Sequence, residues 1–405
     1  MKILIKRVDN LGDVVIIIPI IIALKKKFPG VQITAMVRPQ HRDVLSGYAD
    51  NFIRPKKDLK NISGYNKIIE VDYTIPANYI PGNIKRTKNI RIGVKSFKRK
   101  RHVSRQLFDH LKLHGIDENF SAPVIIVEDK EKIKSEKWLK NNSVKPNDFI
   151  VTIDPGSNFS KKCWPVGYYV ALCSWLINSF NAKIILPGSK EDELLQLIKT
   201  RINSDNIILL TGKKLKFVTA VINNADLHIG NDSGLGHVAA AVNTPTVTIF
   251  GPTSPVLWKP YGNKSITVFN PRVACKGGYE HAATCSIQKC LISIKPNDVA
   301  DAVLASINRF IRPRSPEKFD RISLSPHLKI RRQKENILLK NNLTGHRCLI
   351  KSGWENINPI LDYISTHKSF ESTNRKFKDS KPLLNLFFVH RFIVPNGIAE
   401  NGMYL

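Results

Sequence analysis

The sequence contains few acidic residues and no apolar run long enough to span a membrane. Its 33 Asp and Glu residues face 63 Lys and Arg residues, for a formal net charge of +30 over 405 residues. A membrane-spanning helix needs roughly 18 or more apolar residues, and no stretch approaches that length. The run at residues 14–24 resembles a secretory signal, but Asp13 precedes it, Pro19 breaks it, and no small-residue cleavage site follows. We therefore expect a cytosolic protein.

Cysteine is scarce, and several nucleotide-binding and metal-binding motifs are missing. The six Cys residues are scattered, so we expect a reducing compartment without disulfides. Cys275, His281, Cys285 and Cys290 are potential zinc ligands, but their spacing fits no standard Cys-x-x-Cys pair. A G-x-x-x-x-G-K-[ST] loop, an early G-x-G-x-x-G and an Asp-x-Asp pair are all absent. We therefore expect no metal and no cofactor.

The positive charge predicts attraction to polyanions. Nucleic acid, an anionic membrane surface and a phosphorylated glycolipid all fit, as does a solvated basic surface without any partner. No signature of an RNA-binding or DNA-binding module appears in the sequence, so we expect no nucleic-acid partner. Charge would instead hold the protein at the anionic inner membrane as a peripheral protein.

The apolar periodicity predicts two α/β units. Residues 2–7, 14–28 and 31–37 are typical of a strand, a helix and a second strand, which together form a βαβ unit. The second half repeats this alternation, which implies a parallel sheet with helices on both faces. The strands expected there are 149–153, 183–186, 207–210, 227–229 and 246–250, and the helices are 165–180, 191–201 and 234–242. Shorter strands are expected at 67–71, 89–94 and 124–127.

These patterns divide the chain into two Rossmann-like domains that face a central cleft. We place the N-terminal domain at residues 1–145 and the C-terminal domain at residues 146–314. Residues 128–147 are expected to form a helix and the linker. The basic extension at residues 315–405 shows no clear periodicity and fits either a small subdomain or a partly disordered tail.

Ligands of open α/β sheets bind beyond the carboxyl ends of the strands. Asp13 follows the first strand at the start of a helix, where a carboxylate serves either as a general base or as an ordinary helix cap. Residues 155–165 combine a Gly-Ser turn, Lys162 and Pro165 at a helix start, which suits a phosphate but also fits an ordinary βα loop. Glu191 would bind ribose hydroxyls or complement a helix dipole.

The loop at residues 230–237 carries the strongest of these signals. Its sequence, GNDSGLGH, follows a strand and leads into an Ala-rich helix. Gly234 and Gly236 allow a ligand to approach the backbone closely, and the free N–H groups of residues 233–236 would cradle a diphosphate. Asp232 and His237 flank that position.

Taken together, these stretches resemble glycosyltransferase family 9, the ADP-heptose:lipopolysaccharide heptosyltransferases. The resemblance runs in order from residue 1 to about residue 312. It is carried by KILIKRVDNLGDVVIIIPIIIALKKKFPGVQITAMVRP, PGSNFSKKCWP, LPGSKEDE, GNDSGLGHVAAAVNTPTVTIFGPTSP and CLISIKPNDVADAV. It implies a GT-B fold and a metal-independent, inverting transfer of a heptose from ADP-heptose to the inner core of lipopolysaccharide.

The resemblance also implies roles for individual residues. Asp13 matches the catalytic base, and Lys162 matches the lysine that contacts the donor phosphate. Ser157 matches a further donor-binding position. Glu191 matches the acid that contacts the nucleoside, with Glu193 as a near competitor. The diphosphate loop falls on Asp232, Ser233, Gly234 and His237.

Residues 85–112 form the most basic segment, with Asp109 as the only acid. Because the family binds its acceptor in the N-terminal domain, Lys98, Arg99 and Arg101 are expected to bind the phosphates and carboxylates of the inner core. A solvated basic loop is the alternative.

Three other functions remain open: a nucleic-acid-binding protein, a membrane-surface protein with a decayed transferase site, and a GT-B enzyme that uses a UDP-sugar and another acidic glycan. The presence of Asp13, Lys162, Asp232 and His237 argues against decay.

Overall fold

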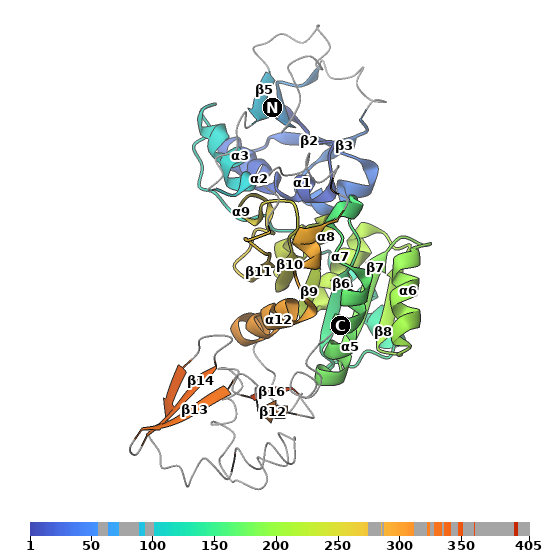
Figure 1. The fold of residues 1–405 in the computed structure, drawn as a ribbon. Coiled ribbons are helices and arrows are strands. Elements are labelled where there is room, and N and C mark those ends of the chain that lie inside the picture. The colour runs from blue at the N-terminus through green and yellow to red at the C-terminus, as the bar shows by residue number, and fades with distance from the viewer. Residues whose placement is uncertain are drawn as a thin grey trace.

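The computed structural model describes the core of the chain and a few strands of its last hundred residues. The described residues are 1–55, 64–72, 89–93, 101–273, 285, 287–311, 322–324, 328–333, 336–341, 347–350, 360 and 393–395. Within them, two parallel sheets with flanking helices lie one above the other (Figure 1).

The first sheet has five parallel strands in the order β3-β2-β1-β4-β5. Its strands are β1 (Lys2–Lys6), β2 (Gln32–Met36), β3 (Asn51–Ile53), β4 (Lys67–Asp72) and β5 (Asn89–Gly93). Its helices are α1 (Leu11–Val15), α2 (Ile18–Lys27), η1 (Pro39–Leu45) and α3 (Val103–Lys112). The central strand β1 buries Ile3, Leu4 and Ile5 completely, as expected of a parallel strand with helices on both faces.

The second sheet has six parallel strands in the order β11-β10-β9-β6-β7-β8. Its strands are β6 (Ile150–Asp154), β7 (Lys183–Gly188), β8 (Ile207–Thr211), β9 (Leu227–Asn231), β10 (Thr246–Ile249) and β11 (Ser265–Val268). Its helices are η4 (Ser160–Lys162), α5 (Val166–Phe180), α6 (Glu193–Ile202), α7 (Leu215–Asn224), α8 (Gly234–Ala241), α9 (Pro255–Trp258), α11 (Lys289–Ile292) and α12 (Pro296–Phe310). If β6 is counted as strand 1, the second sheet has the Rossmann strand order 3-2-1-4-5-6, and the first sheet has the order 3-2-1-4-5. Both Rossmann-like sheets predicted from the sequence are therefore present.

The strand order reverses beside β1 in the first sheet and beside β6 in the second. At such a reversal the loops after neighbouring strands leave in opposite directions and open a crevice. The crevices therefore lie after β1 and β4 in one sheet, and after β6 and β9 in the other. These are the loops that hold Asp13, residues 155–165 and residues 230–237.

The two domains meet where α1 approaches α8. A Cβ atom on Gly234 would lie 2.6 Å from Cβ of Leu11, and one on Gly12 would lie 2.8 Å from Cδ2 of His237. One apolar cluster continues through this contact, because Val238 of α8 packs with the core residues of the first sheet. Both glycines are therefore required for the close approach of the two helices.

Two predicted elements differ from the structure. The helix expected at residues 14–28 is broken into α1 and α2, because Pro19 has no N–H for a continuous helix and begins a new one instead. Residues 124–127 do not form a strand. They run between the sheets as an extended connection, in which the Ile125 N–H donates to the Ala241 carbonyl at 2.9 Å.

The connection leads into α4 (Asp129–Asn141), which packs against α7 of the second unit. The helix predicted near residues 128–147 is thus confirmed, while the domain boundaries at residues 145 and 314 stay a prediction. No helix among the described residues is long and apolar enough to cross a membrane.

The C-terminal extension contains strands that the sequence did not predict. They are β12 (Ile322–Leu324), β13 (Leu328–Gln333), β14 (Asn336–Asn341), β15 (Arg347–Ile350) and β16 (Ile393–Pro395). β13, β14 and β15 form an antiparallel sheet, and β12 pairs with β16. These strands lie beyond α12, on the side of the second domain away from the first sheet (Figure 1).

The contact between α1 and α8 gives a first prediction. Gly234→Ala should destabilise the protein by about 1–3 kcal/mol, because the new methyl group meets Leu11 close to its backbone. The matched control is Gly167→Ala on α5, where no atom lies within 4 Å and alanine favours the helix. Urea unfolding of both variants measures the effect. Equal stability of the two variants would contradict the requirement for glycine at this contact.

Candidate active site

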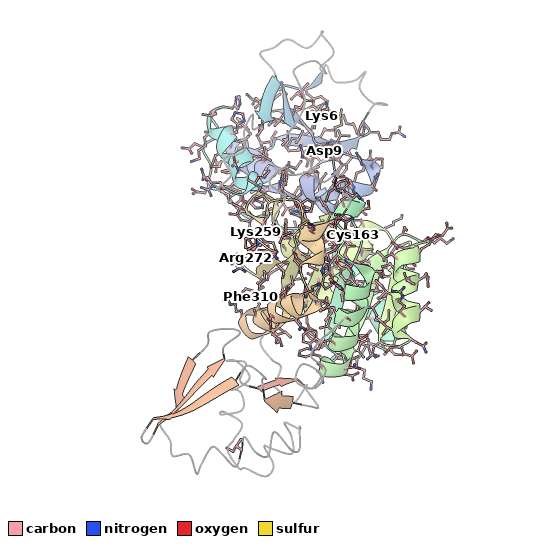
Figure 2. All side chains as sticks on the ribbon, in the orientation of Figure 1. Lys6, Asp9, Cys163, Lys259, Arg272 and Phe310 are labelled. Carbon is pink, nitrogen blue, oxygen red and sulfur yellow. The ribbon has the colours of Figure 1, made fainter. Side chains whose placement is uncertain are left out.

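A cavity of about 900 Å³ lies between the two domains. Its walls come from the loops after β1, β6, β7 and β9, together with α1, α8 and α9. Figure 2 shows Cys163 and Lys259 on the side of the second domain that faces the first, with Asp9 above them in the first domain. The cavity therefore occupies the crevices that the strand order of both sheets predicts.

Asp13 lies on the first-domain wall of the cavity, at the third residue of α1. Its Oδ2 accepts the Asn10 N–H at 3.1 Å, as in a capping box. Its Oδ1 lies 3.0 Å from Nη2 of Arg7. The Asp13 side chain remains 16% exposed, so it is fixed by the protein but still open to the cavity. The sequence analysis missed Arg7, which appeared only as the polar end of a strand.

Lys162 and Asp232 meet on the opposite wall. Nζ of Lys162 lies 2.7 Å from Oδ2 of Asp232, and the Thr253 hydroxyl donates to the same oxygen at 2.6 Å. Both side chains of the ion pair are largely buried and line the cavity. The pair holds an ammonium group where the second domain faces the first, and an anionic ligand would compete with Asp232 for it.

Asn231, which the sequence analysis also missed, shapes this wall. It is fully buried at the end of β9, and its Oδ1 accepts from the Trp164 N–H and the Tyr169 hydroxyl, both at 3.0 Å. Its Nδ2 donates to the carbonyls of Pro155 and Gly156. One side chain thus ties the loop after β6, which carries Lys162, to the neighbouring strand. In the sequence, Asn231 stands in the polar loop GNDSG, where nothing marks it as a residue that connects two strands.

The Ser233 hydroxyl lies against a buried carboxylate at the end of β6. Its hydroxyl donates to Oδ2 of Asp154 at 2.6 Å, and the Gly156 N–H donates to Oδ1 at 3.3 Å. Burial raises the pKa of Asp154 to about 6, although both hydrogen bonds oppose that rise. The Ser233 hydroxyl is therefore committed to Asp154, and the backbone N–H groups at the start of α8 are the anion donors on this wall.

Two histidines complete the cavity where the domains meet. His237 packs against Gly12, and burial lowers its pKa even though Asp232 and Asp13 act in the opposite direction. His41 is buried beside them, and its pKa is lowered mainly by burial. Both imidazoles are neutral near pH 7, so each presents at most one N–H donor.

The domains are also joined beside the cavity by two polar contacts. Nδ2 of Asn158 donates to Oδ1 of Asn10 at 3.2 Å. His102 bridges to the second domain through Nε2, which lies 2.7 Å from the Lys259 carbonyl. Because its Nδ1 accepts the Ser104 N–H, Nε2 carries the proton and is the donor. Burial lowers the pKa of His102 to about 4, which keeps this tautomer neutral.

The structure brings most of the predicted site residues together. The cavity is lined by Asp13, Ser157, Lys162, Asp232, Ser233, Gly234 and His237. Glu191 is exposed and is not among the lining residues, whereas its neighbour Asp192 lines the cavity and caps α6 through the Leu195 N–H. Adjacent acids in one turn cannot be separated by sequence spacing alone.

The predicted acceptor residues do not line the described cavity. Arg101 is exposed and pairs with Asp109 at 2.9 Å, at the start of α3. Lys98 and Arg99 lie outside the described residues. For the zinc hypothesis, Cys275 and His281 also lie outside them, while Cys285 and Cys290 are free thiols. Across the part of the chain that the structure describes, no group of three ligating side chains is arranged for a metal.

The cavity wall is acidic although the chain is basic. Its cationic side chains are Arg7 and Lys162. Its acidic side chains are Asp9, Asp13, Asp154, Asp192 and Asp232. The excess of Lys and Arg in the sequence therefore lies outside this wall. On the wall, Arg7 and Lys162 supply positive charge only to the groups next to them.

Comparison with known proteins identifies the family. The sequence profile of glycosyltransferase family 9 (heptosyltransferase) matches residues 87–289, half of the chain. Lipooligosaccharide heptosyltransferase 2 of Haemophilus influenzae is 28% identical over 152 residues, which are 36% of this chain and 44% of that protein. Lipopolysaccharide heptosyltransferase 3 of Escherichia coli is 24% identical over 290 residues, which are 63% of this chain and 85% of that protein. The chain thus aligns with less than half of the first of these relatives.

Solved structures share the architecture. The family 9 glycosyltransferase of Veillonella parvula matches with a TM-score of 0.64 and 21% identity, over 76% of this chain and 97% of that one. The E. coli ADP-heptose LPS heptosyltransferase II matches with a TM-score of 0.60 and 21% identity, over 76% and 98%. The GT-B fold predicted from the sequence is therefore confirmed.

The buried Asp154 gives a prediction about pH. Because its folded-state pKa of about 6 exceeds its value in an unfolded chain, the native state keeps a proton that the unfolded state has lost between about pH 4 and about pH 6. Stability should fall as the pH rises through this window, and Asp154→Asn should remove that part of the fall. Melting temperatures across the window measure it, with exposed Asp205→Asn as the control. Parallel wild-type and Asp154→Asn profiles would refute the assignment.

Proposed function

The chain belongs to glycosyltransferase family 9, and from that premise we propose that it transfers a heptose from ADP-heptose to the inner core of lipopolysaccharide. The observation that supports this most is that Asp13 of one domain lines the same cavity as Lys162 and the start of α8 in the other. A sugar transfer needs a base on one side of the anomeric carbon and a site for the leaving diphosphate on the other.

On the donor side, the diphosphate would lie at the N-terminus of α8, where the backbone N–H groups from Gly234 onward have no partner inside the helix. Lys162 would leave Asp232 for a phosphate oxygen and stabilise the charge that develops on the departing ADP. Ser157, Asp232 and His237 would border this site, and an acid of the loop after β7, either Glu191 or its cavity-lining neighbour Asp192, would contact the nucleoside. Donor binding would then need neither a divalent metal nor a cofactor.

On the acceptor side, Asp13 would take the proton from the attacking hydroxyl group. Its partly exposed carboxylate faces the cavity from the first domain. The hydroxyl oxygen would then attack the anomeric carbon from the face opposite the leaving ADP. One displacement of this kind inverts the configuration at that carbon.

The basic segment of the first domain would receive the anionic acceptor, with Lys98, Arg99 and Arg101 contacting its phosphates and carboxylates. The acidic cavity wall supports this division, because the described wall offers an anionic acceptor few cations. The net charge of +30 would hold the protein on the cytoplasmic face of the anionic inner membrane.

Calorimetric titration with ADP and with UDP, in the absence of divalent metal, tests the donor. The wild-type protein should prefer ADP, and Lys162→Ala should weaken binding about 10- to 100-fold, since it removes a charged hydrogen-bond donor and leaves Asp232 without its cation. Lys161→Ala is the matched control, because its neighbouring ammonium does not line the cavity. A preference for UDP would instead favour a transferase that uses another nucleotide sugar and a different acidic glycan.

Replacement of the proposed base tests the chemistry. Asp13→Asn keeps the size of the side chain but cannot accept a proton, so kcat should fall about 10²- to 10⁴-fold. Affinity for ADP should not change, because Asp13 lies on the wall opposite the proposed diphosphate site. Transfer of radiolabelled heptose to a truncated lipopolysaccharide measures the rate, with the exposed Asp117→Asn as the control. A variant with wild-type kcat would eliminate Asp13 as the base.

A further inference from the structure

Arg7 is a buried arginine at the end of the central strand of the first sheet. Its side chain has no solvent exposure, whereas Lys6 beside it is 26% exposed and pairs with Glu70. Figure 2 shows Lys6 farther from the second domain than Asp9. Removing a guanidinium group from water costs several kcal/mol unless its partners compensate. The groups that the Arg7 side chain contacts therefore indicate its role in the structure.

Arg7 connects three groups at the reversal point of the first sheet. Its Nη1 donates to the Val71 carbonyl of β4 at 2.9 Å and lies 3.0 Å from Oδ2 of Asp9. Its Nη2 lies 3.0 Å from Oδ1 of Asp13. Because β1 and β4 are neighbouring strands, the guanidinium group is fixed to the sheet itself rather than to a loop. It presents one edge to the carboxylate that faces the cavity.

Both carboxylate oxygens of Asp13 are thereby held, and by different elements. Arg7, at the end of β1, contacts Oδ1, while the Asn10 N–H at the start of α1 donates to Oδ2. A carboxylate with only the Asn10 contact would still be free to rotate. Two contacts on different oxygens restrict that rotation, while the side chain stays partly exposed at the cavity.

We propose that Arg7 is a positioning residue for the transfer reaction, which holds the Asp13 carboxylate in the orientation that accepts the proton of the acceptor hydroxyl. This inference rests on the proposed function of Asp13. The planar guanidinium group suits the role, because it reaches the Val71 carbonyl and two carboxylates in one fixed geometry. A lysine would keep the charge, but its single nitrogen could not replace the two terminal nitrogens that contact these groups.

The experiment compares Arg7→Met, Arg7→Lys and Lys6→Met in the full chain. Lys6→Met is the matched control, because it removes one cation and one ion pair from the adjacent residue of the same strand, and Lys6 does not line the cavity. For each variant, kcat and KM for heptose transfer, the ADP affinity and the melting temperature are measured. Crystal structures of the two methionine variants show where the Asp13 carboxylate lies.

If Arg7 positions Asp13, Arg7→Met lowers kcat about 100-fold, the order expected for a misplaced catalytic group, while the ADP affinity stays at the wild-type value. Arg7→Lys recovers part of kcat, and Lys6→Met retains all of it. A purely structural role would instead lower the melting temperature and leave kcat per folded molecule unchanged. That result overturns the proposal.

The same experiment separates this proposal from the proposed function. If the wild-type protein transfers no heptose, the function is wrong, and the crystal structures alone decide the role of Arg7. An Asp13 carboxylate that has turned away in Arg7→Met but not in Lys6→Met supports positioning by Arg7. An unchanged carboxylate in both variants refutes it.

Discussion

The site depends on how closely α1 and α8 approach each other. Neither Gly12 nor Gly234 has room for a Cβ atom, because the His237 and Leu11 side chains pack directly against their backbones. Asp13 is the residue after Gly12, and the N-terminal turn of α8 begins at Gly234. The contact that joins the two domains is therefore also the contact that places a carboxylate opposite a helix N-terminus. Both parts of the site would separate if this approach were lost.

Electrostatics within the cavity differ from those of the whole chain. Each cation on the wall is paired with acids: Arg7 with Asp9 and Asp13, and Lys162 with Asp232. In the absence of a ligand, these pairs limit the desolvation cost of the two cations, since each of them has a carboxylate nearby. A phosphate that binds Lys162 must replace Asp232 as its partner. This requirement favours ligands whose negative charge lies at that position over anions in general.

Much of this arrangement could be predicted from the sequence, because the strand and helix periods place loops at the carboxyl ends of the strands. Asp13, Lys162 and Asp232 could be located in this way, since each stands in a loop beside a strand or a helix start. Arg7 and Asn231 could not, because their roles depend on contacts across neighbouring strands that no local pattern encodes. Pro19 was visible in the sequence as a helix breaker. The long apolar run around it nevertheless favoured one continuous helix, which the structure does not have.

The attachment of α8 at both of its ends has a mechanical consequence. Leu11 and Gly12 contact its first turn, and the Ile125 N–H holds the carbonyl of Ala241 at its last residue. The helix is therefore held at its first turn by α1 and at its last residue by the connection between the sheets. A helix that is fixed at two points keeps its direction as well as its position, so the N–H groups of its first turn stay at the cavity wall.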